Sequence, residues 1–234
     1  MESELEVERL KSVYRQYNTA ASCEAQWSND NRGNRAILRE RTRLLGRLLH
    51  SAGLVPLTGR RVLDVGCGAG NVLVGLCRWG ASLSDLHGID LRPDAIERGR
   101  HRYPGVDLRV ANAEVLPFAD AQFDLVLLFT VFTSILDERM ARNVADEVRR
   151  VLMPGGVIAW YDLRRNNPRN RNVRGMNRAA IQALFPDFTC RLHAVTLLPP
   201  LARRLGPATP LLYPALAAVP PLRTHYLGLL TKPA

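Results

Sequence analysis

A carboxylate and three glycines stand close together in VLDVGCGAGN, residues 62–71, and give the clearest chemical signal in the chain. Asp64 ends a short apolar run, and Gly66, Gly68 and Gly70 follow before a stretch that predicts a helix. Glycines at such a turn let a ligand approach main-chain N–H groups. A dinucleotide site would show GxGxxG and hold a pyrophosphate. The observed GxGxG spacing, with an acid two residues ahead, would repel a pyrophosphate and suits a ligand ammonium such as that of a methionine group.

Two further positions fall where the next strands should end. Asp90 stands in GID, and a carboxylate at that strand tip can accept both hydroxyls of a ribose. Asn112 stands in ANAEVLPF, where its amide can pair with an exocyclic amine, and the Ala113 N–H could reach a ring nitrogen. The chemistry predicted for this region is therefore recognition of an adenosine that carries an amino-acid group.

Four motifs follow one another between about residues 60 and 162: LDVGCGAG, GID, ANAEVLPFADAQFDLV and RVLMPGG. In this order and spacing they resemble the class I S-adenosylmethionine-dependent methyltransferases, in particular the small UbiE-like members of the methyltransferase type 11 family. The resemblance covers nearly half of the chain. It implies S-adenosyl-L-methionine as cofactor, with S-adenosyl-L-homocysteine as product.

The resemblance also implies roles for residues. The glycine loop would hold the methionine end, the strand-end acid the ribose, and Asn112 with its neighbour the adenine, while Phe129 and Thr130 would line the sulfonium side. Asn112 replaces a more usual Asp, and Thr133–Ser134 stand where relatives often carry two histidines, so a histidine base is absent there. The implied cofactor-binding residues are Asp64, Gly66, Cys67, Gly68, Gly70, Asp90, Leu91, Asn112, Ala113, Phe129 and Thr130.

Short apolar runs alternate with helical patterns from Arg61 onward, which predicts βαβ units and a parallel sheet. The fold class expected is α/β, a Rossmann-like, seven-stranded and mostly parallel sheet with helices on both faces. Residues 1–53 are expected to form N-terminal helices that act as a lid, and residues 54–234 the methyltransferase domain. Within it, residues 163–225 would form an acceptor-side loop and a proline-rich cover.

The net charge of +10 is uneven along the chain. Residues 1–162 carry 21 basic and 21 acidic residues, whereas residues 163–234 carry 11 basic residues and one acid, Asp187. Six of these arginines lie in LRRNNPRNRNVRGMNR, directly after the predicted fifth strand, where this fold places an acceptor. One hypothesis is that the loop selects an anionic acceptor, and the alternative is a solvated loop closed by its own hydrogen bonds. The predicted acceptor-binding residues are Tyr14, Tyr17, Trp27, Arg164, Arg165 and Arg174.

Several function classes are disfavoured. No aromatic residues alternate with the arginines, which disfavours nucleic acid as a partner. Four cysteines without CxxC suit a reducing cytoplasm, no metal site is expected, and no run of 18 apolar residues predicts a membrane span. The stretch LPPLARRLGPATPLLYPALAAVPPL could contact a membrane surface or a lipid-linked acceptor, or pack in a homodimer.

The leading functional hypothesis is an O-methyltransferase of a small or peptide-like anionic or sugar-containing metabolite in bacterial natural-product biosynthesis. The alternatives are C-methylation of a quinone-like ring and a non-catalytic partner that binds S-adenosylmethionine. A hydroxyl acceptor would benefit from a general base. The catalytic candidates near the fifth and sixth strands are Asp162, Tyr161 and His193.

Overall fold

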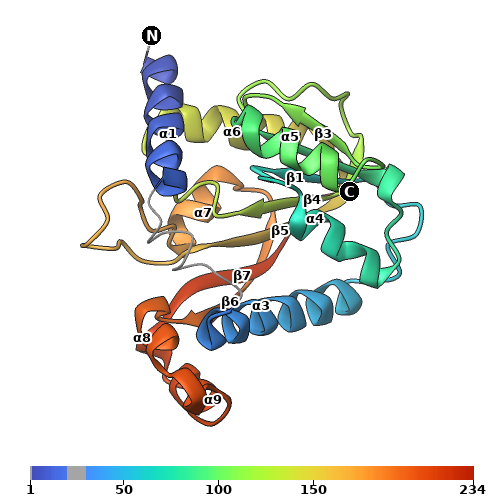
Figure 1. Ribbon diagram of the computed structural model, residues 1–234. Helices are drawn as coiled ribbons and strands as arrows, with labels where there is room; N and C mark the ends of the chain where they lie inside the picture. Colours follow the sequence, from blue (N-terminus) through green and yellow to red (C-terminus); the bar gives the residue numbers. More distant parts are fainter. Residues whose placement is uncertain (1, 20–29) are drawn as a thin grey trace.

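The computed structural model describes residues 2–19 and 30–234 and shows one seven-stranded sheet with helices on both faces (Figure 1). The strand order is β3-β2-β1-β4-β5-β7-β6. Only the last strand, β7, runs antiparallel to its neighbours, so the predicted mostly parallel sheet is confirmed. The strands are β1 (Val62–Val65), β2 (Leu86–Asp90), β3 (Asp107–Val110), β4 (Phe123–Phe129), β5 (Leu152–Leu163), β6 (Thr189–Leu197) and β7 (Arg223–Thr231).

The helices include several that the sequence pattern did not predict. The proline-rich stretch after β6 folds into α8 and α9, because Pro199, Pro200 and Pro210 stand in the first turns of these helices, where no N–H donor is required. Pro214 lies inside α9. The predicted helix from residue 71 breaks after one turn and continues as a 3₁₀ helix. The α-helices are α1 (Glu2–Thr19), α3 (Arg32–Ser51), α4 (Asn71–Val74), α5 (Pro93–Arg102), α6 (Glu138–Val151), α7 (Arg178–Leu184), α8 (Pro199–Arg204) and α9 (Thr209–Ala217). The 3₁₀ helices are η1 (Gly75–Trp79), η2 (Leu83–Asp85), η3 (Gly206–Ala208) and η4 (Pro220–Leu222).

Alternate residues of β4 point into two separate cores. Leu125 and Leu127 pack with α3, α4 and α5, whereas Val126 and Leu128 pack with α6 and α7 on the other face. Both faces of the strand are thus buried, which explains why its sequence is continuously apolar rather than alternating.

The two N-terminal helices lie in different places (Figure 1). α1 packs over the loops that follow β2 and β4, with Leu10 in the core under α6. α3 begins at Asn31, whose side chain accepts hydrogen bonds from the N–H groups of Gly33 and Asn34. It lies on the opposite face of the sheet, against β6, β7 and α8. At Gly33 a Cβ atom would stand 2.1 Å from the Ala202 carbonyl oxygen, so this glycine permits the close approach of α3 and α8.

The loop after β4 is held by an aromatic stack. The Phe132 ring stacks on the Trp160 ring of β5 at a centroid distance of 5.1 Å, and Phe185 meets both rings edge-on. All three side chains are fully buried. This stack fixes the loop of residues 130–136, which forms one wall of the site described next.

Replacing Trp160 by alanine should remove the stack and leave a cavity under that loop. We expect the free energy of unfolding to fall by about 3–5 kcal/mol, as measured by urea denaturation. The exposed control Leu211→Ala should change it by no more than about 0.5 kcal/mol. Equal losses in both variants would contradict the assigned role of the stack.

Candidate functional site

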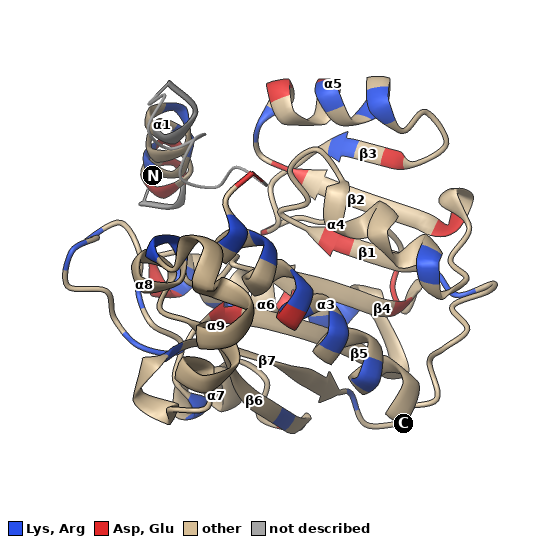
Figure 2. Cartoon of the chain, turned by 60° about the horizontal axis from the view of Figure 1, so that its bottom comes forward, with Lys and Arg blue, Asp and Glu red and all other residues tan. Residues whose placement is uncertain are grey.

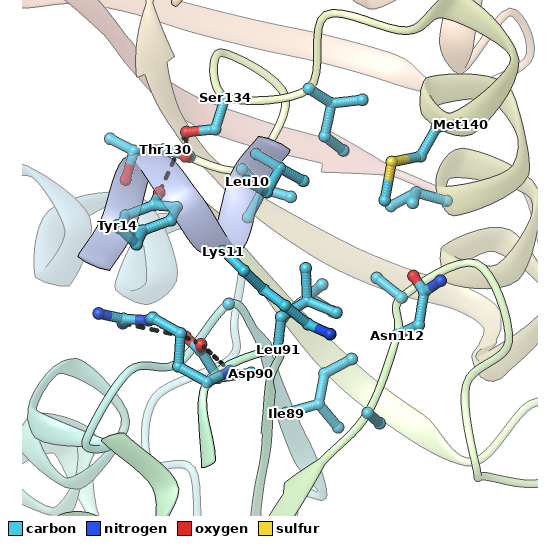
Figure 3. Close-up of a pocket in the computed structure, with 18 of the residues that line it drawn as sticks. Leu10, Lys11, Tyr14, Ile89, Asp90, Leu91, Asn112, Thr130, Ser134 and Met140 are labelled. Carbon is cyan, nitrogen blue, oxygen red and sulfur yellow. Dashed lines mark hydrogen bonds and ion pairs between the residues drawn. The ribbon is translucent and has the colours of Figure 1, made fainter. Parts of the chain in front are cut away.

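A pocket of about 210 Å³ lies at the carboxyl ends of β1, β2 and β4, under α1 (Figure 3). The edge of the sheet supplies its polar groups, and α1 and α6 supply an apolar wall. The structure therefore brings together many of the residues that the sequence singled out from separate motifs. Those that line the pocket are Tyr14, Gly66, Asp90, Leu91, Asn112, Ala113, Phe129 and Thr130.

The glycine loop after β1 turns with positive φ angles at all three glycines: 76° at Gly66, 56° at Gly68 and 77° at Gly70. A Cβ atom at Gly66 would stand 3.3 Å from Val131 Cγ2, so a side chain would also narrow the pocket. Cys67 points away, and its Sγ atom packs close to the backbone of β2. Burial raises the pKa of this thiol, which therefore stays protonated. The N–H groups of all three glycines already donate within the protein, to Ile89, Asp90 and Cys67, so the loop gives a ligand room for close approach rather than free donors at these positions. The cysteine serves packing.

The Asp64 carboxyl is buried in β1 and is not among the groups that line the pocket. It is 2% exposed and accepts no hydrogen bond from any residue that the structure describes. Burial first, and then the charge of Asp90, raise its pKa to about 8, while the Arg41 guanidinium opposes the rise. A buried carboxyl without donors is costly, and a ligand ammonium would provide both charge and hydrogen bonds. This carboxyl and the glycine turn beside it are compatible with the methionine end of S-adenosylmethionine.

Asp90 is fully engaged within the protein. Its Oδ2 atom accepts from the Gly68 N–H at 2.8 Å, and its Oδ1 atom accepts from the Arg92 N–H at 3.0 Å. The Arg92 side chain adds Nε to Oδ1 at 3.0 Å and Nη2 to Oδ2 at 3.3 Å, and its guanidinium lies 4.8 Å from the Tyr14 ring centre. Hydroxyls of a ribose can reach this carboxylate only after the Arg92 side chain swings aside.

Asn112 stands at the opposite end of the pocket from Tyr14 (Figure 3). Its Oδ1 atom accepts from the Glu114 N–H at 3.1 Å, and its Nδ2 atom donates to the Glu114 carboxylate at 3.2 Å. The N–H of Ala113 makes no hydrogen bond to any residue in the described ranges. That N–H and the second lone pair of Oδ1 suit the edge of an adenine ring.

α1 closes the pocket from above. The Glu6 carboxylate accepts from the N–H of Leu136 at 2.7 Å, Arg9 donates to the Ser134 carbonyl oxygen at 2.5 Å, and the Tyr14 and Ser134 hydroxyls are 3.1 Å apart. These contacts tie the helix to the loop after β4. The side chain of Tyr17 and all of Trp27, both predicted to bind the acceptor, lie outside the described residues.

Sequence reasoning missed two cations at this site. Lys11 extends along the pocket beside Leu91 (Figure 3). The Arg92 side chain covers Asp90 through two hydrogen bonds. The sequence could have indicated Lys11, because residues 10, 11 and 14 lie on one face of a helix and Tyr14 was already predicted to bind the acceptor. Arg92 could have been suspected from its place two residues after the strand-end acid. The other lining residues that were missed are Leu10, Val65, Ile89, Ala111, Val131, Ser134, Ile135, Met140 and Val144.

The three catalytic candidates do not line this pocket. Asp162 is fully buried, and its oxygens accept from the N–H groups of Thr133 at 3.0 Å and Leu163 at 3.1 Å. Tyr161 stacks on His225 and shares a hydrogen bond with Thr196, and burial raises the pKa of its hydroxyl. His193 is exposed on the edge strand β6.

The arginine loop after β5 is organised largely by its own asparagines. Asn166 accepts from the N–H of Gly175 at 2.8 Å, and other asparagines in the loop cap nearby N–H groups in the same way. Arg164 lies over the Tyr226 ring, and Arg165 is exposed. Arg174 lies beside the pocket wall, since its carbonyl oxygen accepts from the Thr133 hydroxyl and its buried Nε has no partner among the described residues.

Comparison with known proteins gives a consistent result. Residues 62–156 match a family model described as a methyltransferase domain. A phthiotriol/phenolphthiotriol dimycocerosates methyltransferase of Mycobacterium tuberculosis is 42% identical over 119 residues, which are 50% of this chain and 43% of that protein. The chain thus covers less than half the length of that relative.

Solved structures share the fold. An S-adenosylmethionine-dependent methyltransferase from Mesorhizobium loti superposes with a TM-score of 0.57 at 20% identity, covering 79% of this chain and 95% of that chain. The [4+2]-cyclase SpnF superposes with a TM-score of 0.58 at 19% identity, covering 82% and 80%. At such identities the likeness establishes the fold alone.

The state of Asp64 leads to a test by calorimetry with S-adenosylhomocysteine. Its carboxyl is protonated below about pH 8, and only the carboxylate attracts an ammonium. Binding near pH 7 should therefore release up to about one proton, and affinity should rise with pH from about 6 to 7. Two buffers of different ionisation enthalpy measure the released proton.

The variant Asp64→Asn should bind more weakly, release no such proton and show a flat pH dependence. The control Asp94→Asn, which removes an exposed carboxyl paired with Arg98, should behave as the parent. Proton release that persists in Asp64→Asn would show that another group is responsible.

Proposed function

We propose that this chain, which contains a class I S-adenosylmethionine-dependent methyltransferase domain, transfers the cofactor's methyl group to a hydroxyl oxygen of a metabolite with a large apolar part. The observation that carries the proposal is the pocket itself. Its lining includes Gly66, Asp90 and Asn112, which suit the methionine, ribose and adenine parts of the cofactor. An apolar wall stands beside them, formed by Leu10, Ile135, Met140 and Val144.

The mycobacterial relative supports an apolar acceptor. Its name states methylation of phthiotriol and phenolphthiotriol dimycocerosates, which are lipids. A lipid-like acceptor is therefore the substrate class that we infer for this chain. Under this proposal, an anionic, peptide-like or sugar group would be only one part of the acceptor, attached to a lipid-like molecule.

Positioning is the main task left to the protein. A bound S-adenosylmethionine supplies a methyl group on a sulfonium, which is already a good leaving group. The glycine loop and Asp64 would fix the methionine end, and the apolar wall would exclude water. Alignment of the reacting atoms can contribute roughly 7–11 kcal/mol. The pocket lining includes no histidine, and its carboxylate, Asp90, is already engaged.

A direct test is transfer of radiolabelled methyl from S-adenosylmethionine to lipid and aqueous extracts, followed by location of the methyl group in the product. Label on an oxygen of an apolar product supports the proposal. Label on a ring carbon would favour C-methylation of a quinone-like ring. Cofactor binding without any turnover would favour a non-catalytic partner protein.

The arginine loop provides a test of acceptor charge. If the acceptor carries an acidic group, Arg174→Gln should raise its KM about tenfold and leave kcat nearly unchanged, because a charge-assisted hydrogen bond is lost. Arg165→Gln, an exposed change in the same loop, is the matched control. An unchanged KM in Arg174→Gln would rule out this arginine as the selector of an anionic group.

A further inference from the structure

A second hollow lies between α3 and α9 and shares no lining residue with the pocket under α1. It has a volume of about 620 Å³. We call it the basic groove. One side is a row of arginines on α3, and the other side is the uncharged helix α9 (Figure 2). The arginines that line it are Arg32, Arg35, Arg39, Arg43, Arg47 and Arg223.

The row follows from helical spacing. The positions 32, 35, 39, 43 and 47 recur every three or four residues and therefore share one stripe of α3. All but Arg35 in this row are exposed, and those four exposed arginines make no ion pair with any residue in the described parts of the chain. Such a row repels itself unless an anion is near.

The acid in the groove does not neutralise the row. Glu40 is the sole acid of α3, against six arginines. Its Oε2 atom accepts from the Tyr213 hydroxyl at 2.7 Å and from the Thr196 N–H at 3.0 Å. Its role is to hold α9 and β6 against α3, so the positive potential of the groove is directed outward.

α9 adds an apolar surface beside the row. Residues 205–222 contain no charged side chain. Tyr213 and Ala217 are buried against α3, whereas Leu211 is 78% exposed, Leu212 40% and Val219 43%. Leucines exposed together on a short helix mark an interaction surface rather than a solvated one.

We propose that the basic groove and the outer face of α9 dock on a bilayer that contains anionic phospholipids. The guanidinium groups of α3 would meet headgroup phosphates, and Leu211 and Leu212 would enter the acyl boundary. Surface charge and an inserted apolar helix are the two signals that together hold a protein on a membrane. In the described part of the chain, no helix is long and apolar enough to cross one.

Other occupants fit the surface less well. A nucleic acid would use the arginines but leave the leucines exposed, since the groove offers only one aromatic ring, that of the buried Tyr213. A second copy docked symmetrically through α9 would bring two arginine rows close to each other. A bilayer alone matches both the charge and the apolar helix.

The experiment is flotation of the full chain with lipid vesicles in the absence of S-adenosylmethionine. We expect binding to vesicles that contain phosphatidylglycerol, little binding to pure phosphatidylcholine, and weakening by salt. The triple variant R39Q/R43Q/R47Q should bind at least about tenfold more weakly. The matched control R98Q/R102Q/R142Q removes the same charge from exposed sites on α5 and α6 and should bind as the parent.

A second measurement locates α9. The variant Leu211→Trp should show blue-shifted emission with anionic vesicles and quenching by brominated acyl chains, relative to the parent. The proposal is overturned by equal binding to both vesicle types, by an equal loss in the control triple variant, or by emission from the introduced indole that stays unquenched. It is also overturned if duplex RNA binds through the same arginines while vesicles do not. Failure of the membrane proposal would not affect the proposed methyl transfer, because neither vesicle experiment depends on the pocket under α1.

Discussion

A carboxyl group that leaves water must find donors or lose its charge, and three such groups stand at the carboxyl edge of this sheet. Asp162 is satisfied by backbone N–H groups, which bind the loop after β4 to the end of β5. Asp90 is satisfied by two N–H groups and the Arg92 side chain. Asp64 is not satisfied by the described chain, and burial raises its pKa to about 8. The first carboxyl supports the pocket wall, the second holds the glycine loop, and the third is the one that we propose for a ligand ammonium.

Asp162, at the same carboxyl edge of the sheet, has a structural role, and the site can be explained without a catalytic base. Asp162 looked like a base because it ends β5 beside the expected acceptor. Its oxygens are instead committed to the backbone, and burial raises its pKa to about 7. Were it to leave these donors for an acceptor proton, the loop that carries Thr130 and Ser134 would lose one of its attachments to β5. Methyl transfer from a sulfonium does not require Asp162 as a base, since orientation of the reacting atoms can provide much of the rate acceleration.

The sheet and the glycine loop could be predicted from the sequence because both follow local rules. Continuous apolar runs mark strands buried on two faces, and positive φ angles require glycine. The position of Arg92 two residues after Asp90 could suggest that the two are neighbours, but the four hydrogen bonds that saturate the carboxylate could not be predicted, because sequence spacing reveals no side-chain direction. The helices α8 and α9 were missed since prolines were taken as breaks, although Pro199, Pro200 and Pro210 stand where helices tolerate them.

The charge count along the sequence placed the positive surface in residues 163–234 alone, and the structure places part of it elsewhere. The balance of residues 1–162 hides an unequal distribution, because many of its acids are paired locally, as Asp94 is with Arg98 and Glu147 with Arg150. The exposed arginines of α3 are left without such partners in the described chain, and the fold sets them beside the acid-free segment after Asp187. The positive surface is thus assembled from both parts of the sequence.

α3 connects that surface to the pocket. Its outward stripe carries the basic groove, and its inward face carries Arg41, which lies 5.2 Å from the centres of both the Phe129 and Tyr161 rings. Arg41 also opposes the rise in the pKa of Asp64. Because Gly33 lets α3 contact α8 closely, the helix is fixed to the C-terminal segment as well as to the sheet. If the outer stripe of α3 binds a bilayer, the bilayer would therefore set the orientation of the pocket. On the inner face, the Arg41 charge would favour ionisation of the Asp64 carboxyl when a ligand ammonium binds.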